Sequence, residues 1–290
     1  MKTKFKEIHF REDSLARIDL CNQVIEEYQG QGLRLTLRQL YYQLVTRNSV
    51  PNIERSYKNL STLVSDARLA GLMDWEAIED RARQPIQQSE FSGLPDLVEV
   101  AIRSYRLPRW EGQEYYAELW VEKDALAGVL LPLAFEFHVT MMVNRGYSSQ
   151  SAMFESAARF TDADRQTPIL FYLGDHDPSG EDMVRDVSER LRIFGVSDIQ
   201  VKKLALTMDQ IEQYKPPPNP AKVSDPRATK YIREHGESSW EVDALPPEIL
   251  RGIIRKAFNV IIDQEKMDVV KRQEERDKKR LRDLVKSKNR

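Results

Sequence analysis

Hydrophobic residues over the first hundred positions recur every three to four residues, which is the spacing of one face of an α-helix. The pattern predicts helices over residues 13–28, 36–45, 56–70 and 94–106. Thr36 and Gln39 form a capping-box pair at the start of the second helix. Three short helices followed by the irregular stretch 72–91 fit a winged-helix domain, with that stretch as the wing.

After a turn-rich linker at 108–113, short apolar runs alternate with helical stretches. We expect strands at 115–121, 139–144, 169–173 and 199–206, and helices at 125–135, 149–160 and 181–194. The helix at 125–135 is expected to bend or end near Pro132. This alternation predicts an α/β fold with a mostly parallel, Rossmann-like sheet that is covered on both faces.

The remaining residues read as a connector followed by helices. A proline-rich stretch at 214–220 is expected to be extended, and a strongly apolar helix begins near Pro247. From Gln264 on, charges dominate and predict a solvated, net basic helix. The chain is thus expected to comprise a helical, winged-helix-like domain (1–107), an α/β domain (108–213) and a C-terminal extension (214–290) that completes the α/β domain.

Composition narrows the class of protein. The net charge is −2, so nucleic-acid binding would need local basic patches. A single cysteine, Cys21, excludes internal disulfides and zinc–cysteine clusters and favours a reducing compartment. No apolar stretch is long enough for a membrane span, and the first residues do not resemble a signal peptide. We therefore expect a cytoplasmic protein.

The strand predicted at 169–173 leads into an acidic turn that contains Asp175 and Asp177. Asp177 precedes Pro178, so it is placed as the N-cap of the next helix. Two carboxylates held close together repel, and a divalent cation is the usual reason for their proximity. Three alternatives stay open: capping alone, a solvated loop, and a calcium loop of the EF-hand type, which would need a helix where this strand is predicted.

Two further groups of residues, in the second and third predicted helices, are candidates for a catalytic or DNA-binding role. Tyr42 falls off the buried stripe of its helix, and Arg38 lies one turn earlier on the same face, although Tyr42 could simply pack against a neighbouring segment. The third helix has an outward face of basic and hydroxyl residues that suits contacts to phosphates and base edges, or is an ordinary solvated face. Its candidate DNA-binding residues are Lys58, Ser61, Thr62 and Arg68.

Several motifs occur in an order that resembles one family. Glu122 after the first strand, followed by Asp175 and Asp177 after the third, resembles the Toprim domain of topoisomerases, primases and some nucleases. Val121-Glu122-Lys123, Arg145-Gly146-Tyr147-Ser148 and Gly174-Asp175-His176-Asp177-Pro178-Ser179-Gly180 look like the Toprim motifs of the topoisomerase VI A subunit and its meiotic relative. Leu37-Arg38-Gln39-Leu40-Tyr41-Tyr42 resembles the segment that carries that family's nucleophilic tyrosine, and Trp240-Glu241-Val242-Asp243-Ala244-Leu245 resembles a later segment.

The resemblance implies a winged-helix plus Toprim enzyme that cleaves double-stranded DNA. Tyr42 would form a covalent 5′ link beside Arg38, and Glu122, Asp175 and Asp177 would hold Mg²⁺ (or Mn²⁺). Lys123 and Arg145 would join the DNA contacts. The resemblance also implies a nucleoid-associated homodimer in which one protomer's tyrosine faces the other's metal site.

Two other functions compete with this reading. One is a Toprim nuclease of a plasmid- or phage-defence system, in which metal-activated water attacks and Tyr42 is structural. The other is a non-catalytic DNA-binding protein. Because no ATP-binding motif occurs in the sequence, an ATPase subunit could act only in trans.

Overall fold

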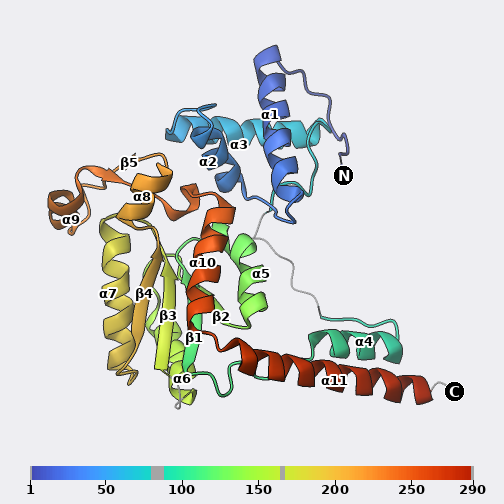
Figure 1. The fold of residues 1–290 in the computed structure, drawn as a ribbon. Helices are drawn as coiled ribbons and strands as arrows, with labels where there is room; N and C mark the ends of the chain where they lie inside the picture. The colour runs from blue at the N-terminus through green and yellow to red at the C-terminus, as the bar shows by residue number, and fades with distance from the viewer. Residues whose placement is uncertain (1, 80–87, 164–166, 289–290) are drawn as a thin grey trace.

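The computed structural model describes residues 2–79, 88–163 and 167–288, with side chains described as far as 284. Three helices open the chain and lie together at one end of the molecule (Figure 1): α1 (Glu12–Gln29), α2 (Leu37–Thr46) and α3 (Glu54–Leu69). Thr36 and Gln39 form the predicted capping box of α2. The described part of the predicted wing holds one isolated bridge, between Leu35 and Ile78, and residues 80–87 of the wing lie outside the described residues.

The α/β part contains a four-stranded parallel sheet. Its strands are β1 (Tyr115–Val121), β2 (Thr140–Val143), β3 (Thr167–Leu173) and β4 (Gln200–Ala205), in the order β2-β1-β3-β4. In the register of this sheet Val121 lies opposite Leu173, so β1 and β3 end at the same level. The residues that follow them, Glu122 and Gly174, are therefore brought to one edge of the sheet.

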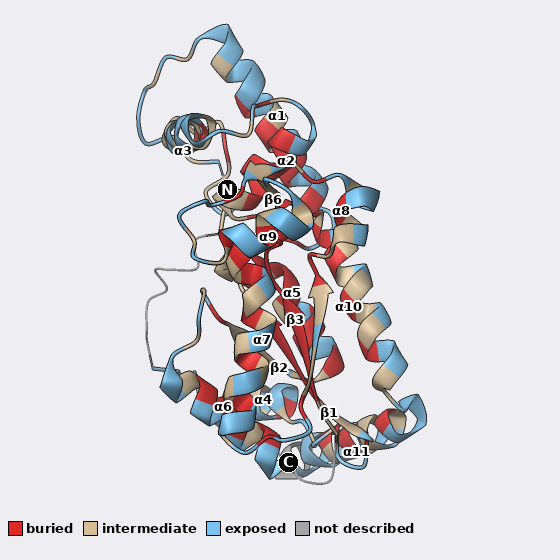
Figure 2. Ribbon diagram, turned by 90° about the vertical axis from the view of Figure 1, so that its left-hand side faces the viewer, coloured by how far each residue is buried: buried red, intermediate tan, exposed pale blue. Residues whose placement is uncertain are grey.

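Helices cover both faces of the sheet, as the alternating pattern predicts (Figures 1 and 2). One face packs against α5 (Ala127–Phe137) and α10 (Pro247–Ile261), and the other against α6 (Gln150–Asp162) and α7 (Pro178–Ile193). Successive strand residues alternate between these layers: Leu119 and Phe171 face the first, Trp120 and Tyr172 the second. The helix α5 does not end near Pro132, which was one of the two expectations there, but continues through it to Phe137.

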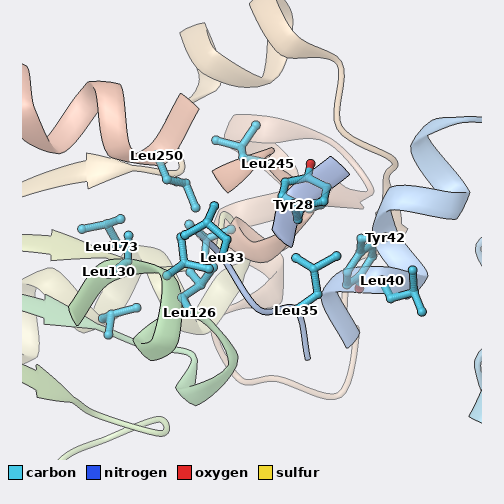
Figure 3. Close-up of a cluster of buried hydrophobic side chains, with 14 of the residues drawn as sticks. Tyr28, Leu33, Leu35, Leu40, Tyr42, Leu126, Leu130, Leu173, Leu245 and Leu250 are labelled. Atoms are coloured by element: carbon cyan, nitrogen blue, oxygen red, sulfur yellow. The ribbon is translucent and has the colours of Figure 1, made fainter. Parts of the chain in front are cut away.

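The larger buried cluster joins the three N-terminal helices to the sheet. Leu33 and Leu35, between α1 and α2, lie in the same cluster as Leu126, Leu130 and Leu250 (Figure 3). Burying apolar side chains stabilises by about 25 cal/mol for each Å² removed from water. This shared core fixes α2 at the edge of the sheet where β1 and β3 end.

Residues 207–245 form small elements on that same edge. They are α8 (Met208–Tyr214), β5 (Asn219–Pro220), α9 (Ala228–His235), β6 (Ser238–Ser239) and the short 3₁₀ turn η2 (Val242–Ala244), and β5 pairs with β6. A second 3₁₀ turn, η1 (Asp124–Leu126), precedes α5. The sequence pattern predicts neither α8 nor α9, because each is only about two turns long.

The helix α4 (Leu94–Ser104) packs against α11 (Gln264–Lys288), at the end of the molecule far from α1 (Figure 1). This placement differs from the expected grouping of residues 1–107. Most described residues of α11 are exposed, as expected for a solvated helix, but Met267, Glu274 and Lys278 are buried. Glu274 of α11 is 1% exposed and accepts two hydrogen bonds from Arg109, at 2.8 Å each, and one from the Leu107 amide at 3.0 Å. These bonds tie α11 to the segment that follows α4.

We predict that Glu274→Gln destabilises the chain by about 2–3 kcal/mol at pH 7. Hydrogen bonding from Arg109 lowers the pKa of Glu274 from 4.5 to about 2. A depressed folded-state pKa contributes stability that is present above about pH 4.5 and is lost as the pH falls towards 2. Urea denaturation followed by circular dichroism should therefore show the wild-type advantage shrinking between those pH values.

Glu136→Gln is the matched control, because Glu136 pairs with Arg255 at 2.8 Å on an exposed surface. It should change the unfolding free energy by less than about 1 kcal/mol. A Glu274→Gln variant as stable as this control at pH 7 would contradict the prediction.

Within the described ranges, every helix is too short or too polar to cross a lipid bilayer.

Candidate functional site

The loop after β3 presents two carboxylates at the sheet edge. The Asp175 amide donates to Glu122 Oε2 at 3.0 Å, and this bond holds the residue after β1 against the residue after Gly174. Asp177 is the N-cap of α7, as predicted, and its Oδ1 accepts from the Gly180 amide at 2.6 Å and from the Ser179 hydroxyl at 2.9 Å. The register of β1 and β3 and the cap of α7 together fix the positions of Glu122, Asp175 and Asp177.

This loop is tight enough to require glycine at position 180. A Cβ on Gly180 would lie 2.2 Å from the carbonyl oxygen of Asp175, a backbone atom that cannot move without moving the loop. By contrast, a Cβ on Gly252 in α10 would meet no atom within 4 Å.

We predict opposite effects on stability for alanine at these two positions. Gly180→Ala should destabilise by about 1–3 kcal/mol, because the loop must shift to make room. Gly252→Ala should stabilise by about 0.5–1 kcal/mol, because alanine restricts the unfolded chain and favours the helix. Thermal unfolding of both variants beside wild type measures this, and a Gly180→Ala protein as stable as wild type would contradict the geometry.

Burial and mutual repulsion dominate the electrostatics of the carboxylates. Burial raises the pKa of Glu122 to about 7, and the neighbouring Asp175 carboxylate adds to this shift. Burial likewise raises the pKa of Asp175, although Lys123 Nζ lies 2.6 Å from its Oδ2 and opposes the rise. Although burial lowers the pKa of Lys123, the carboxylates of Asp175 and Asp243 raise it more. The ammonium group of Lys123 therefore does not by itself compensate the charge of the Glu122 and Asp175 carboxylates.

Helix α2 presents Arg38 and Tyr42 to the same region. The Arg38 guanidinium carbon lies 5.6 Å from the centre of the Tyr42 ring, which agrees with their predicted placement on one helix face. The expectation that Tyr42 is exposed is wrong: the residue is 4% exposed and belongs to the core cluster (Figure 3). η2 packs on α2 and excludes solvent from this face. Burial raises the pKa of Tyr42 to about 12.

A pocket of about 310 Å³ joins the two groups of residues. Arg38 and Tyr42 line it from α2, and Asp175 and Asp177 line it from the loop after β3. Residues more than 130 positions apart in one chain therefore share one concave site, the setting in which small ligands and phosphate groups bind. Glu122 does not line this pocket, and it is joined to it through the hydrogen bond that its carboxylate accepts from the Asp175 amide.

Two acids that we did not assign from the sequence belong to this site. Asp243 Oδ2 accepts from Arg38 Nε at 2.8 Å, and Glu241 forms an ion pair with Arg38 and lies 3.6 Å from Lys123 Nζ. The sequence indicates a role for one of them, Asp243. Asp243 interrupts the apolar run of Val242, Ala244 and Leu245, and an acid in a buried run needs a partner.

The candidate DNA-binding residues do not all face solvent. Lys58 is exposed and pairs with Glu54 at 2.7 Å, and Ser61 and Thr62 follow on α3, whose first turns line the pocket. Arg68 differs from the prediction: its guanidinium lies 4.8 Å above the Trp75 ring and donates to the Trp75 carbonyl.

Arg145 lies apart from these residues, in the loop after β2, and its Nη2 donates to Asp124 at 3.0 Å. Arg145 does not line the pocket.

The predicted metal ligands suit a divalent cation in their chemistry but do not form a ready cage. Among the described residues, no three acidic, histidine or cysteine side chains are grouped closely enough to hold a metal ion. Asp175 is engaged by Lys123 and by the Val242 amide, and Asp177 by its cap bonds. All three candidates supply the oxygen ligands that Mg²⁺ prefers. Burial, followed by repulsion from neighbouring carboxylates, raises the pKa of Glu122 and Asp175, and a bound cation would favour their charged forms.

No model of a known protein family matches the chain, and no curated protein matches it. The functional interpretation therefore depends on the geometry and chemistry of the pocket.

Proposed function

We propose that the chain cleaves double-stranded DNA by transesterification, with Tyr42 as the nucleophile and Mg²⁺ or Mn²⁺ as the cofactor. The observation that carries the proposal is the shared pocket, in which Arg38 and Tyr42 face Asp175 and Asp177. A nucleophile, a fixed cation and paired carboxylates in one concave site are the groups that phosphodiester chemistry needs.

In the proposed reaction Tyr42 Oη bonds to phosphorus as the bond from phosphorus to the 3′ oxygen breaks. The phenol proton leaves to a base, the 3′ oxygen takes up a proton, and the DNA keeps a 5′-phosphotyrosyl link. Arg38 would bind a phosphate oxygen and favour the phenolate, since a nearby cation stabilises the charged form of an acid.

Glu122, Asp175 and Asp177 would hold the metal ion, which supplies positive charge to the phosphate oxygens when it is bound. Lys123 Nζ lies 2.6 Å from Asp175 Oδ2, and a cation bound by Asp175 would compete with this ammonium group. The freed ammonium group of Lys123 would then be available to a DNA phosphate. In this proposal Lys123 changes partner as metal and DNA enter.

The DNA would reach the pocket over α3, where Lys58, Ser61 and Thr62 follow the turns that line it. Arg145 would contact the backbone from the loop after β2. The resemblance implies that one protomer's tyrosine faces its partner's metal site, whereas here Tyr42 shares a pocket with Asp175 and Asp177 of the same chain. In this proposal two copies of the chain would therefore each cut one strand with their own residues, and strand passage would need an ATPase subunit in trans. These partners belong to the proposal together with the chemistry.

The test is to incubate the protein with supercoiled plasmid and Mg²⁺, denature it, and separate free DNA from protein-bound DNA. Transesterification predicts that cut DNA enters the protein-bound fraction and returns to the free fraction after protease treatment. Cut DNA found only in the free fraction, or no cutting at any metal concentration, would overturn this mechanism.

A second candidate is hydrolysis by metal-activated water, with Tyr42 in a structural role. One observation favours it: burial raises the pKa of Tyr42 to about 12, which disfavours the phenolate at neutral pH. The denatured plasmid reaction separates the two, because hydrolysis leaves free ends and no adduct.

A further inference from the structure

One short stretch of chain contacts both halves of the pocket. We call residues Trp240 to Asp243 the bridge segment; it runs from β6 into η2. On the side of the acidic loop, the His176 amide donates to the Trp240 carbonyl at 2.8 Å and the Trp240 amide to the His176 carbonyl at 2.9 Å. The Val242 amide donates to Asp175 Oδ1 at 3.0 Å. The bridge segment is therefore fixed to the loop that carries the candidate metal ligands.

The same segment contacts α2 through its two acids. Asp243 is 1% exposed, and its Oδ2 accepts from Arg38 Nε at 2.8 Å. Its Oδ1 is buried without a hydrogen-bond partner in the described structure, so Arg38 is the side chain that hydrogen-bonds this carboxylate, with Lys123 close enough to interact with its charge. Glu241, at the pocket wall, pairs with another nitrogen of Arg38. A hydrogen bond to a buried carboxylate restricts where the cation that donates it can lie.

The orientation of Arg38 follows from these contacts. Its Nε donates to Asp243, its guanidinium carbon lies 5.6 Å from the centre of the Tyr42 ring, and the residue lines the pocket. The planar guanidinium offers donors in a fixed fork, so fixing one edge by hydrogen bonding sets the direction of the others. Asp243 thereby sets the direction in which Arg38 faces the pocket.

We propose that Asp243 is a positioning residue for DNA cleavage: it orients Arg38 towards Tyr42 and the scissile phosphate. The bridge segment that carries Asp243 is hydrogen-bonded to the loop after β3, so Arg38 is also held in a fixed position relative to the candidate metal ligands. The inference rests on the proposed function, because it concerns the geometry of that reaction. Asp243 touches neither the nucleophile nor the substrate and acts through Arg38. A purely structural role would instead be to hold α2 on the sheet domain.

The experiment compares Asp243→Asn, Arg38→Gln and the double variant in plasmid cleavage, with Glu136→Gln as a control on a distant ion pair. Asp243→Asn should lower the rate at saturating DNA by about 10- to 100-fold, the usual effect of losing a partner that orients a site residue. The DNA concentration at half-maximal rate should change by less than about threefold, since DNA contacts remain. The double variant should be no slower than Arg38→Gln alone.

Asp243→Glu tests the geometry of the contact. It keeps the charge but is one methylene longer, so it should recover part of the rate lost in Asp243→Asn. An Asp243→Asn enzyme with wild-type rate, or losses that multiply in the double variant, would overturn the inference. So would a loss explained by weaker DNA binding alone.

A nuclear magnetic resonance spectrum of the Arg38 side chain provides a readout that does not depend on cleavage. In wild type the Nε–H signal should be a resolved, slowly exchanging peak, and in Asp243→Asn it should broaden or move to the position of a free arginine. An unchanged Arg38 peak in Asp243→Asn would overturn the inference that Asp243 orients Arg38. A wild-type chain that cuts no DNA would overturn the proposed function, and this peak would then decide whether Asp243 orients Arg38.

Discussion

Tyr42→Phe is expected to abolish DNA cleavage, with a loss in rate of about 10⁴-fold or more, the scale seen when a nucleophile is removed. The substitution removes only the hydroxyl that would attack phosphorus. The ring stays in the core cluster beside Leu35 and Leu40, so the fold should be retained (Figure 3). Cleavage of labelled DNA in Mg²⁺, measured over several hours, determines the ratio.

Tyr41→Phe is the matched control on the same helix. Tyr41 is as buried as Tyr42, but its hydroxyl is directed to Pro51 and Ile53, with donor–acceptor distances of 3.3 and 3.2 Å. Its loss should cost about 1 kcal/mol of stability and leave the cleavage rate within about threefold of wild type. A Tyr42→Phe protein that cuts DNA as fast as Tyr41→Phe would contradict the nucleophile assignment and favour hydrolysis.

Asp177→Asn should lower Mg²⁺-dependent cleavage by about 10²- to 10³-fold, the cost of removing one group that supports charge stabilisation in a transition state. Asparagine is as good an N-cap as aspartate, so the bond from the Gly180 amide and the start of α7 should survive. What is lost is the negative charge that would hold the cation. Calorimetric titration with Mg²⁺ or Mn²⁺ should show affinity weakened by about tenfold or more.

Asp186→Asn controls for a general change of charge on α7, where Asp186 lies 3.4 Å from Arg190 and away from the pocket. It should bind metal and cut DNA as wild type does. Equal metal affinity in Asp177→Asn and Asp186→Asn would remove Asp177 from the metal site. Equal cleavage rates would show that its charge has no part in the reaction.

Local sequence signals predicted the acidic half of the site. β1 and β3 are short, mostly apolar runs that are buried over their last five residues, so their ends, and hence the positions of Glu122 and Asp175, could be predicted from the pattern alone. Asp177 could be assigned as an N-cap because Pro178 follows it. Parallel pairing then brings the ends of both strands to one edge, whatever the rest of the chain does.

The burial of Tyr42 and the role of Asp243 could not be predicted in this way. Both depend on η2 packing against α2, a contact between segments about 200 residues apart in the sequence. The helical period places Tyr42 off the stripe that packs on α1 and α3, but it carries no information about a later segment that covers the opposite side. Arg68 was misplaced for a related reason, since Trp75 approaches it through a turn that has no regular pattern.

The pairing of α4 with α11 shows the same limit over a longer separation. The apolar face of α4 does not specify which element it packs against, and Arg109, in the segment after α4, forms an ion pair with Glu274 of α11. Sequence periodicity predicts that a helix forms, whereas charge pairing across 165 positions decides where it lies.

Mass spectrometry of the protein after reaction with DNA tests the central claim most directly. The protein is incubated with DNA and Mg²⁺, denatured, digested with nuclease and then with protease, and the peptides are sequenced. The account predicts that the peptide containing Tyr42 carries the mass of a 5′-linked nucleotide and that Tyr41 in the same peptide is unmodified. Efficient cutting of the DNA with Tyr42 unmodified would contradict it.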